Sequence, residues 1–335
     1  MRRFGLFAAV MLWSAAASAE PGAAWKSLDP GAAEYVATIK REIDNYFGQY
    51  HPTAVMVVRD DLVVATTGDI TRKVNVRSVR KSLLSALFGI AVERGEIKLE
   101  DTLEHLGIDD SAPSLTSQEQ QATVRQLLMA RSGIYHPAAY ETRDQKEARP
   151  LRGAFAPGTH WYYNNWDFNA LGAIYEKATG ENAFKGFEHL IARPTGMEDF
   201  AAADGVFIGD SSSHYPAYTF NMTARDLARF GLLYLNKGRW NGAQIIPSQW
   251  VAESTRSYSD TGRGDRGYGY LWWTLNGTAW GESAALANGN GGQLIAVLPA
   301  KRLIVVETVG MDGSSNGIRS QDFLDLVQRI MTLVQ

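Results

Sequence analysis

The chain has 335 residues, 45% of them hydrophobic and 21% charged, a composition typical of a globular protein with a substantial core. Its 33 basic and 36 acidic residues give a net charge of −3, so nothing in the charge balance favours nucleic acid as a partner. Cysteine is absent, which excludes a thiol nucleophile, an iron–sulfur cluster, a cysteine zinc site and disulfide bonds.

The first 19 residues predict a secretory signal. Two arginines precede an apolar run, and the small residues at its end are typical of a cleavage site between Ala19 and Glu20. The apolar run is too short to cross a bilayer comfortably, so we expect no stable membrane insertion. The pattern predicts a signal peptide over 1–19 and a periplasmic or secreted protein with a single domain over 20–335.

The next part of the chain predicts a helix, two strands and a second helix. Apolar residues at helical spacing mark the helices, and short β-branched runs mark the strands. Ser78 is a plausible N-cap of the second helix, and Gly95 is a plausible stop. The expected bounds are 32–49, 53–59, 62–68 and 78–95.

From about 97 to 262 the sequence predicts mostly helices and long loops. The clearest helix there spans 223–238, with Thr223 as its cap and Gly238 at its end. Beyond residue 267 the chain predicts about three strands and a closing amphipathic helix. The expected landmarks are a strand over 268–275, a hairpin turn at Asn276-Gly277, a second hairpin of 292–299 and 302–310, and a helix over 318–334.

This order of elements predicts an α+β fold. The early and late strands are expected to form one antiparallel sheet, flanked by the N- and C-terminal helices. The sheet part would comprise 32–96 and 263–335, and 97–262 would form a mainly helical insertion beside it.

Three other patterns are weaker functional signals. "GSSNG" at 313–317 has no histidine after it, which excludes the usual nucleophile elbow, and "GRGDRG" at 262–267 lacks the strand and helix of a dinucleotide site, which favours a loop. None of the six histidines is paired at metal-ligand spacing, so we expect no metal or other cofactor. Only His136, in the loop "SGIYHPAAY", is a candidate for a pocket.

Ser78 and Lys81 are the strongest chemical signal in the chain. On a helix, positions three apart share one face, so the lysine amine can reach the serine hydroxyl. A lysine base needs its pKa lowered by about three units, which costs roughly 4 kcal/mol and requires burial or nearby positive charge. The same pair also fits a surface charge beside a helix cap, so the spacing alone leaves both interpretations open.

The residues around this pair resemble a known family. "SVRK" followed by "SLLSALFGIAVERGEIKLEDTL" is similar to the first motif of the serine β-lactamase and penicillin-binding-protein superfamily. The best match is its class C β-lactamase-like branch, which includes family VIII carboxylesterases and 6-aminohexanoate-dimer hydrolases. The resemblance covers about residues 32–330 and implies a β-lactamase/transpeptidase-like fold.

The second motif of the superfamily is a tyrosine, any residue, then asparagine. The stretch "PGTHWYYNNWDFNALG" resembles it in two registers, which begin at Tyr162 or at Tyr163. The usual spacing to the final glycine, Gly172, favours Tyr163 and Asn165.

The third motif departs from the pattern, because "ALANGNGGQ" has neither the lysine nor the histidine of the family. The best alignment uses Ala287-Asn288-Gly289, and places the second oxyanion donor at the Asn290 N–H, beside that of Ser78. Gly289 would let a substrate approach the strand backbone closely.

The resemblance implies a secreted serine hydrolase that cleaves an ester or a small or linear amide. Ser78 would form the acyl-enzyme, Lys81 and Tyr163 would shuttle the proton, and Asn165 would position the lysine or the substrate. Four aromatic residues fit either an apolar substrate cleft or ordinary core: Tyr135, Tyr140, Trp161 and Trp166. Two alternatives stay open, a β-lactamase or DD-peptidase of the same fold and a non-catalytic binding protein. The oligomeric state is not predicted.

Overall fold

The computed structural model describes residues 25–28, 34–110, 113–311 and 317–334. Within that part of the chain, nine strands form one sheet in the order β1-β3-β2-β14-β13-β12-β11-β10-β9. All neighbours are antiparallel except β1 and β3. The strands are β1 (Lys26–Ser27), β2 (Ala54–Arg59), β3 (Leu62–Gly68), β9 (Ser259–Arg263), β10 (Arg266–Tyr268), β11 (Trp273–Leu275), β12 (Ala285–Gly289), β13 (Gln293–Leu298) and β14 (Leu303–Thr308).

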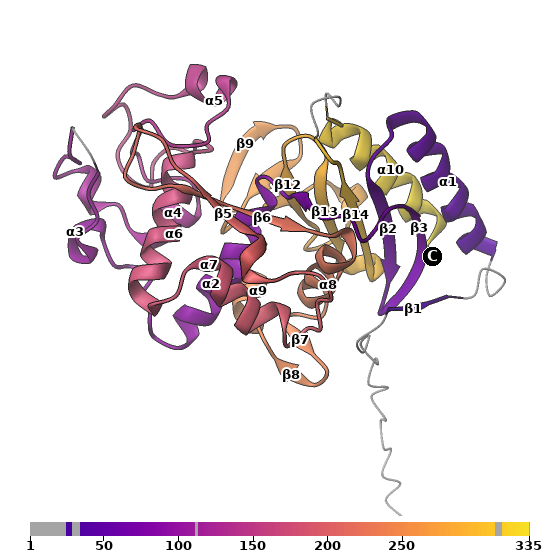
Figure 1. The fold of residues 1–335 in the computed structure, drawn as a ribbon. Coiled ribbons are helices and arrows are strands. Elements are labelled where there is room, and N and C mark those ends of the chain that lie inside the picture. Colours follow the sequence, from indigo (N-terminus) through magenta and orange to yellow (C-terminus); the bar gives the residue numbers. More distant parts are fainter. Residues whose placement is uncertain (1–24, 29–33, 111–112, 312–316, 335) are drawn as a thin grey trace, which may run out of the picture.

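The early and late strands meet at the centre of this sheet, where β2 pairs with β14. Helices α1 (Glu34–Tyr50) and α10 (Ser320–Leu333) lie side by side along it (Figure 1). Helix α8 (Ala224–Leu235) packs on the other face, because its Gly231 faces Ile304, whereas Glu307 of the same strand faces α1. The predicted α+β fold with an antiparallel sheet between terminal helices is confirmed.

The middle of the chain forms a second body beside the sheet. This second body contains more strands than the sequence predicted. β6 pairs with both β4 and β5, and β7 pairs with β8. The helices are α2 (Val79–Glu93), α3 (Leu103–Leu106), α4 (Val124–Leu128), α5 (Arg143–Ala148), α6 (Asn165–Thr179), α7 (Ala183–Phe187) and α9 (Ser248–Ser254). The strands are β4 (Val74–Asn75), β5 (Gly205–Ile208), β6 (Ala217–Met222), β7 (Arg239–Trp240) and β8 (Ala243–Gln244).

Helix α2 joins the two bodies. Every residue from Val79 to Ala91 is buried, as expected for a helix that packs on all sides. It contacts β12 and β13 of the sheet on one side, and α6, α7 and α9 on the other. Its first turn therefore lies between the two bodies, and Ser78 lies directly before that turn.

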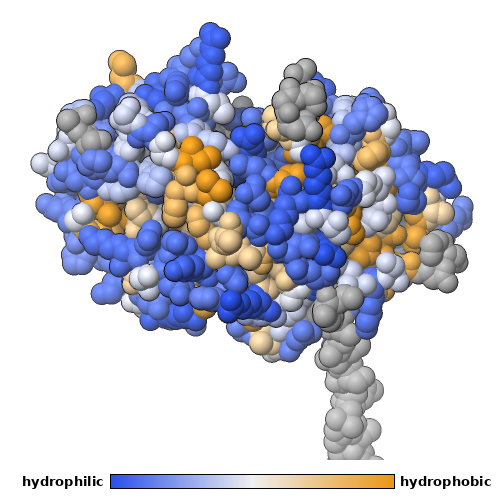
Figure 2. Space-filling view, in the orientation of Figure 1, coloured by the Kyte–Doolittle hydropathy of each residue, from blue (hydrophilic) through white to orange (hydrophobic). Residues whose placement is uncertain are grey.

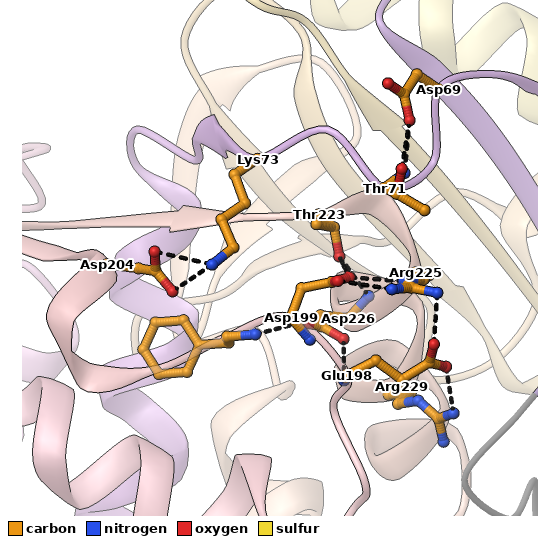
Figure 3. Close-up of polar contacts among 11 residues, drawn as sticks. Asp69, Thr71, Lys73, Glu198, Asp199, Asp204, Thr223, Arg225, Asp226 and Arg229 are labelled. Carbon is orange, nitrogen blue, oxygen red and sulfur yellow. Dashed lines mark hydrogen bonds and ion pairs between the residues drawn. The ribbon is translucent and has the colours of Figure 1, made fainter.

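The segment that leads to α2 is tied to the helical body by charged side chains (Figure 3). Lys73 pairs with Asp204 at 2.8 Å, just before β4 begins. Nearby, Asp199 accepts two hydrogen bonds of 2.6 Å from Arg225, and Asp226 accepts backbone N–H groups of the 198–200 loop. This network fixes the start of α8 to the loop that carries Asp204.

Two predictions for the sheet, one of a strand and one of a turn, are wrong. Residues 268–275 are not one strand, because the chain turns between β10 and β11 at Leu271, which has φ 62°. Asn276-Gly277 is not a hairpin turn either: a longer connection with a 3₁₀ turn at Thr278–Trp280 follows β11. Asp265 explains this outcome, because it accepts hydrogen bonds from the Asn276 backbone and the Trp280 indole.

Of the remaining local predictions, some are confirmed, some are wrong, and some concern residues that the structure does not describe. Residues 262–267 are not an irregular loop but the tip of the β9–β10 hairpin. The hairpin after β13 and the stop at Gly95, with φ 71°, are confirmed. The helix predicted over 223–238 ends earlier, at Leu235, and Lys237, with φ 53°, is the first residue with positive φ after it. The predicted signal peptide and residues 313–316 of "GSSNG" lie outside the described residues.

The described helices include none that is long and apolar enough to cross a membrane. On the face drawn in Figure 2, hydrophilic residues surround separate hydrophobic patches.

Candidate active site

Ser78 is presented by a tight turn between β4 and α2. Arg77, directly before it, has φ 52°, and its N–H donates to the Asn75 side chain at 2.8 Å. A positive φ is uncommon for a residue other than glycine, and marks a locally constrained backbone. Ser78 occupies the predicted N-cap position of α2, but its side chain makes no cap hydrogen bond. Its hydroxyl is left to interact with Lys81.

Lys81 completes the predicted pair. Its Nζ lies 2.8 Å from Ser78 Oγ, and the residue is only 2% exposed. The Nζ also lies 4.8 Å from the ring centroid of Tyr163 and 4.7 Å from that of Phe168. Burial holds the pKa of Lys81 well below its usual range, and the charge of Arg80 lowers it further. The interpretation as a surface charge is therefore wrong.

Arg80 is a buried cation beside this base. Its guanidinium donates to Asn169 at 3.1 Å and lies 4.4 Å from the ring centroid of Tyr218. In the part of the chain that the structure describes, it forms no ion pair with a carboxylate. Its charge is consequently not neutralised by a neighbour, and it favours the uncharged amine of Lys81.

Tyr163, and not Tyr162, reaches the pair. The Tyr162 hydroxyl donates to the Gln145 carbonyl at 2.7 Å, which takes it away from Ser78. Burial raises the pKa of Tyr163, against opposing interactions with the Ser78 hydroxyl and with Arg80 and Arg263. Tyr163 is thus a neutral phenol at ordinary pH, suited to passing a proton on.

Asn165 supports this loop from behind. It is the first residue of α6, and its amide donates to the Tyr140 carbonyl at 2.8 Å. The Gln145 amide lies 3.4 Å from both the Asn165 side chain and the Tyr163 carbonyl. Through these contacts Asn165 holds the backbone around Tyr163, and in the described structure its side chain makes no hydrogen bond with Lys81.

The third-motif stretch lies opposite Ser78. Asn288 and Gly289 belong to β12, Asn290 follows it, and all three line the same cavity as Ser78. A Cβ on Gly289 would stand 2.5 Å from the Val76 carbonyl oxygen. Only glycine therefore lets β12 approach the backbone that carries Ser78.

The cavity has a volume of about 690 Å³. It is bounded by α5, the loop before α6, β9, β11, the end of β12 and the residues before α10. Of the aromatic residues considered from sequence, Trp161 lines it. Tyr140 accepts a hydrogen bond from Arg77, directly before Ser78, whereas Trp166 is fully buried and donates to Asp110 at 2.6 Å.

Tyr135 and His136 are not among the described residues that line the cavity. Tyr135 is buried edge-on against Tyr162, with ring centroids 5.8 Å apart. His136 is 4% exposed and lies 3.9 Å from Glu119, and burial lowers its pKa. Both residues pack behind the loop that carries Tyr163.

Sequence reasoning missed several cavity residues. Arg263 was hidden in the glycine-rich stretch expected to be a loop, and Arg319 in the closing helix pattern. Asp144 and Gln145 belong to α5, whose Thr142–Gln145 capping box was a readable signal for a helix. Nothing in that signal says that the helix borders Ser78.

Comparisons with known proteins identify the family and the fold of this chain. A family model described as Beta-lactamase matches residues 40–310. A relative from Alkalihalophilus pseudofirmus, an uncharacterized protein, is 25% identical over 268 residues, or 72% of this chain and 75% of that protein.

Two solved structures share the fold. A protein from Bacillus anthracis, assigned as a 6-aminohexanoate-dimer hydrolase, matches with a TM-score of 0.67 and 20% identity over 87% of this chain and 80% of that chain. The D-alanine carboxypeptidase AmpC from Burkholderia cenocepacia matches with a TM-score of 0.61 and 19% identity over 89% of this chain and 99% of that chain. Because the family model spans most of the sequence and the fold agrees, the chain belongs to the beta-lactamase family of serine hydrolases.

Proposed function

We propose that this protein is a secreted serine hydrolase that cleaves an ester or a small or linear amide through an acyl-enzyme on Ser78. The observation that carries the proposal is the 2.8 Å contact between Ser78 Oγ and the buried amine of Lys81. A lysine whose pKa lies well below its usual range can accept a proton at neutral pH, which an exposed lysine cannot.

The first half of the reaction forms the acyl-enzyme. Lys81 takes the hydroxyl proton of Ser78 while Oγ attacks the substrate carbonyl carbon. The carbonyl oxygen becomes an oxyanion, for which the N–H groups of Ser78 and Asn290 are the proposed donors. The carbon–oxygen or carbon–nitrogen bond to the leaving group then breaks, and the proton returns through Tyr163 to the departing alcohol or amine. Water repeats the sequence to release the acid and restore Ser78.

The cavity favours esters and simple amides over β-lactams. Ala287 of β12 stands where the family motif has a lysine or histidine, so the side chain that holds the carboxylate of the antibiotic is missing. Because a D-alanine carboxypeptidase is among the proteins that share the fold, the experiments must also test the DD-peptidase alternative.

Hydrolysis of short-chain p-nitrophenyl esters tests the proposal. We expect Ser78→Ala to abolish turnover, whereas Ser82→Ala retains it, because Ser82 binds the Leu271 carbonyl one turn along α2, outside the cavity. Tyr163→Phe is expected to lower kcat/KM by about 10²–10⁴, and Tyr162→Phe far less, because the Tyr162 hydroxyl is bound to a carbonyl.

Parallel assays separate the alternatives. Strong turnover of nitrocefin that depends on Ser78 would support the β-lactamase alternative instead. Absence of both Ser78-dependent turnover and labelling by a serine-reactive phosphonate would support the non-catalytic binding protein.

A further inference from the structure

Two arginines line the cavity, and they differ in their partners. Arg319 binds Asp322 through two hydrogen bonds, of 2.9 and 2.7 Å. Arg263 forms no ion pair with any carboxylate in the described part of the chain. Asp144, the acidic residue among the described lining residues, is exposed on α5 and forms no ion pair with it. Among the described lining residues, Arg263 is therefore the cation that has no carboxylate partner.

Aromatic rings hold the Arg263 guanidinium in place. Its central carbon lies 5.3 Å from the ring centroid of Trp273 and 6.0 Å from that of Trp161. A guanidinium over an aromatic face gains cation–π energy, and its N–H groups point outward from the edge of its plane. The two tryptophans thus restrict the orientation of a long side chain without using its donors.

The same rings connect Arg263 to the reacting groups. The Trp273 ring stacks on Tyr163, with centroids 5.4 Å apart and an angle of 27° between the planes. Arg263 is also close enough to Tyr163 to be one of the cations that oppose the raised pKa of its phenol. A substrate bound at Ser78 and lying along this wall would bring one end to the guanidinium.

We propose that Arg263 binds a carboxylate of the substrate, and that the natural substrates are esters or amides that carry an acid group. This rests on the proposed hydrolase function. A guanidinium presents a planar fork of donors that matches a carboxylate in a bidentate manner. Arg263 lies on β9, at the hairpin formed by the glycine-rich stretch, and β11 and β10 separate this strand from β12, which carries the third motif. The carboxylate that it binds would therefore lie at a different place from the one that the family motif holds.

Matched substrate pairs test the assignment. The first pair is mono-p-nitrophenyl adipate and its methyl ester, which differ in the charge of the acyl half. The second is 4-carboxyphenyl butyrate and its methyl ester, which differ in the charge of the leaving group. For each pair the readout is the ratio of kcat/KM for the acid to kcat/KM for the neutral ester, because a ratio cancels general effects on catalysis.

We expect Arg263→Gln to lower this ratio about tenfold for at least one pair, the size expected when a hydrogen bond between charged groups is lost. Arg263→Lys should give an intermediate ratio. Arg319→Gln is the matched control, because it removes the same charge from the cavity wall, and it should leave the ratio close to that of the wild type.

An equal ratio in wild type and Arg263→Gln for both pairs, with Ser78-dependent turnover intact, would overturn the role of Arg263 alone. So would an Arg319→Gln variant that moves the ratio as much. Absence of Ser78-dependent turnover on all four substrates would overturn the hydrolase function together with this inference.

Discussion

At the scale of single residues, the reactive pair was predictable and its electrostatic environment was not. The spacing of Ser78 and Lys81 places both on one helix face, and the family resemblance selected Tyr163 over its neighbour. Arg77 and Arg80 both lie within four residues of Lys81 in the sequence. In the structure, Arg80 is fully buried beside Lys81, whereas Arg77 is only partly buried and contacts Tyr140. Which arginine turns inward depends on packing against α6 and β6, which local spacing does not report.

The role of Arg80 predicts a pH dependence. Lys81 acts as a base only when it is deprotonated, so kcat/KM should rise with pH through the pKa of Lys81. Burial lowers that pKa most and the Arg80 charge lowers it further, so we expect Arg80→Met to shift the acidic limb of the kcat/KM profile for ester hydrolysis to higher pH. Arg80→Lys keeps a positive charge and should leave the limb near its wild-type position. An unmoved limb in a folded Arg80→Met variant, checked by circular dichroism, would contradict this account.

At the scale of elements, the ends of helices were predictable where a cap residue or a glycine in the local sequence also sets the end of the helix in the structure. Thr223 accepts the expected cap hydrogen bond from the Asp226 N–H, and Gly95, with a positive φ, directly follows the C-cap of α2. The Asn276-Gly277 signal failed because contacts with Asp265 in the neighbouring hairpin outweigh a local turn preference. Strand order around Ser78 depends on such long-range contacts, so the approach of β12 was expected only from the family resemblance.

That approach gives a prediction about Gly289. Its Cβ would overlap the Val76 carbonyl oxygen, so Gly289→Ala should push β12 away from Ser78. We expect the free energy of unfolding to fall by about 1–3 kcal/mol and kcat/KM to fall about 10²-fold. Gly48→Ala is the control: it adds the same methyl group to α1, where nothing lies within 4 Å, and should stabilise by about 0.5–1 kcal/mol. Calorimetry and ester kinetics on both variants would decide; a fully active, equally stable Gly289→Ala would refute the steric argument.

At the scale of the whole molecule, the layered architecture followed from the order of helices and strands. The sequence pattern placed the early and late strands in one sheet because their terminal helices need a common apolar face. It did not reveal the small sheet of β4, β5 and β6, because β4 has only two residues and the short strands β5 and β6 lie inside a stretch of helical patterns. Nor did it reveal the buried acid at the centre of the main sheet. Glu307 lies in a mostly apolar strand, and the register of the strand decides which face of the sheet its carboxyl points to.

Glu307 predicts how the stability of the whole domain depends on pH. It is fully buried on β14, and burial raises its pKa to about 8, with the Tyr46 hydroxyl opposing that shift. The unfolded chain releases this proton near the usual glutamate pKa of about 4.3, whereas the folded protein keeps it until about pH 8. In that window the folded state binds more protons, so stability is highest at the acidic end and is lost as pH rises.

We therefore expect Glu307→Gln to flatten the fall in unfolding free energy between pH 5 and 8, measured by urea denaturation. The amide keeps the shape of the side chain but has no proton to lose, so the variant should be more stable than the wild type at pH 8. Glu93→Gln removes the same charge from an exposed position at the end of α2 and should leave the slope unchanged. If Glu307→Gln and the wild type lose stability in parallel as pH rises, another group is responsible, and the buried carboxyl is already ionised at pH 5.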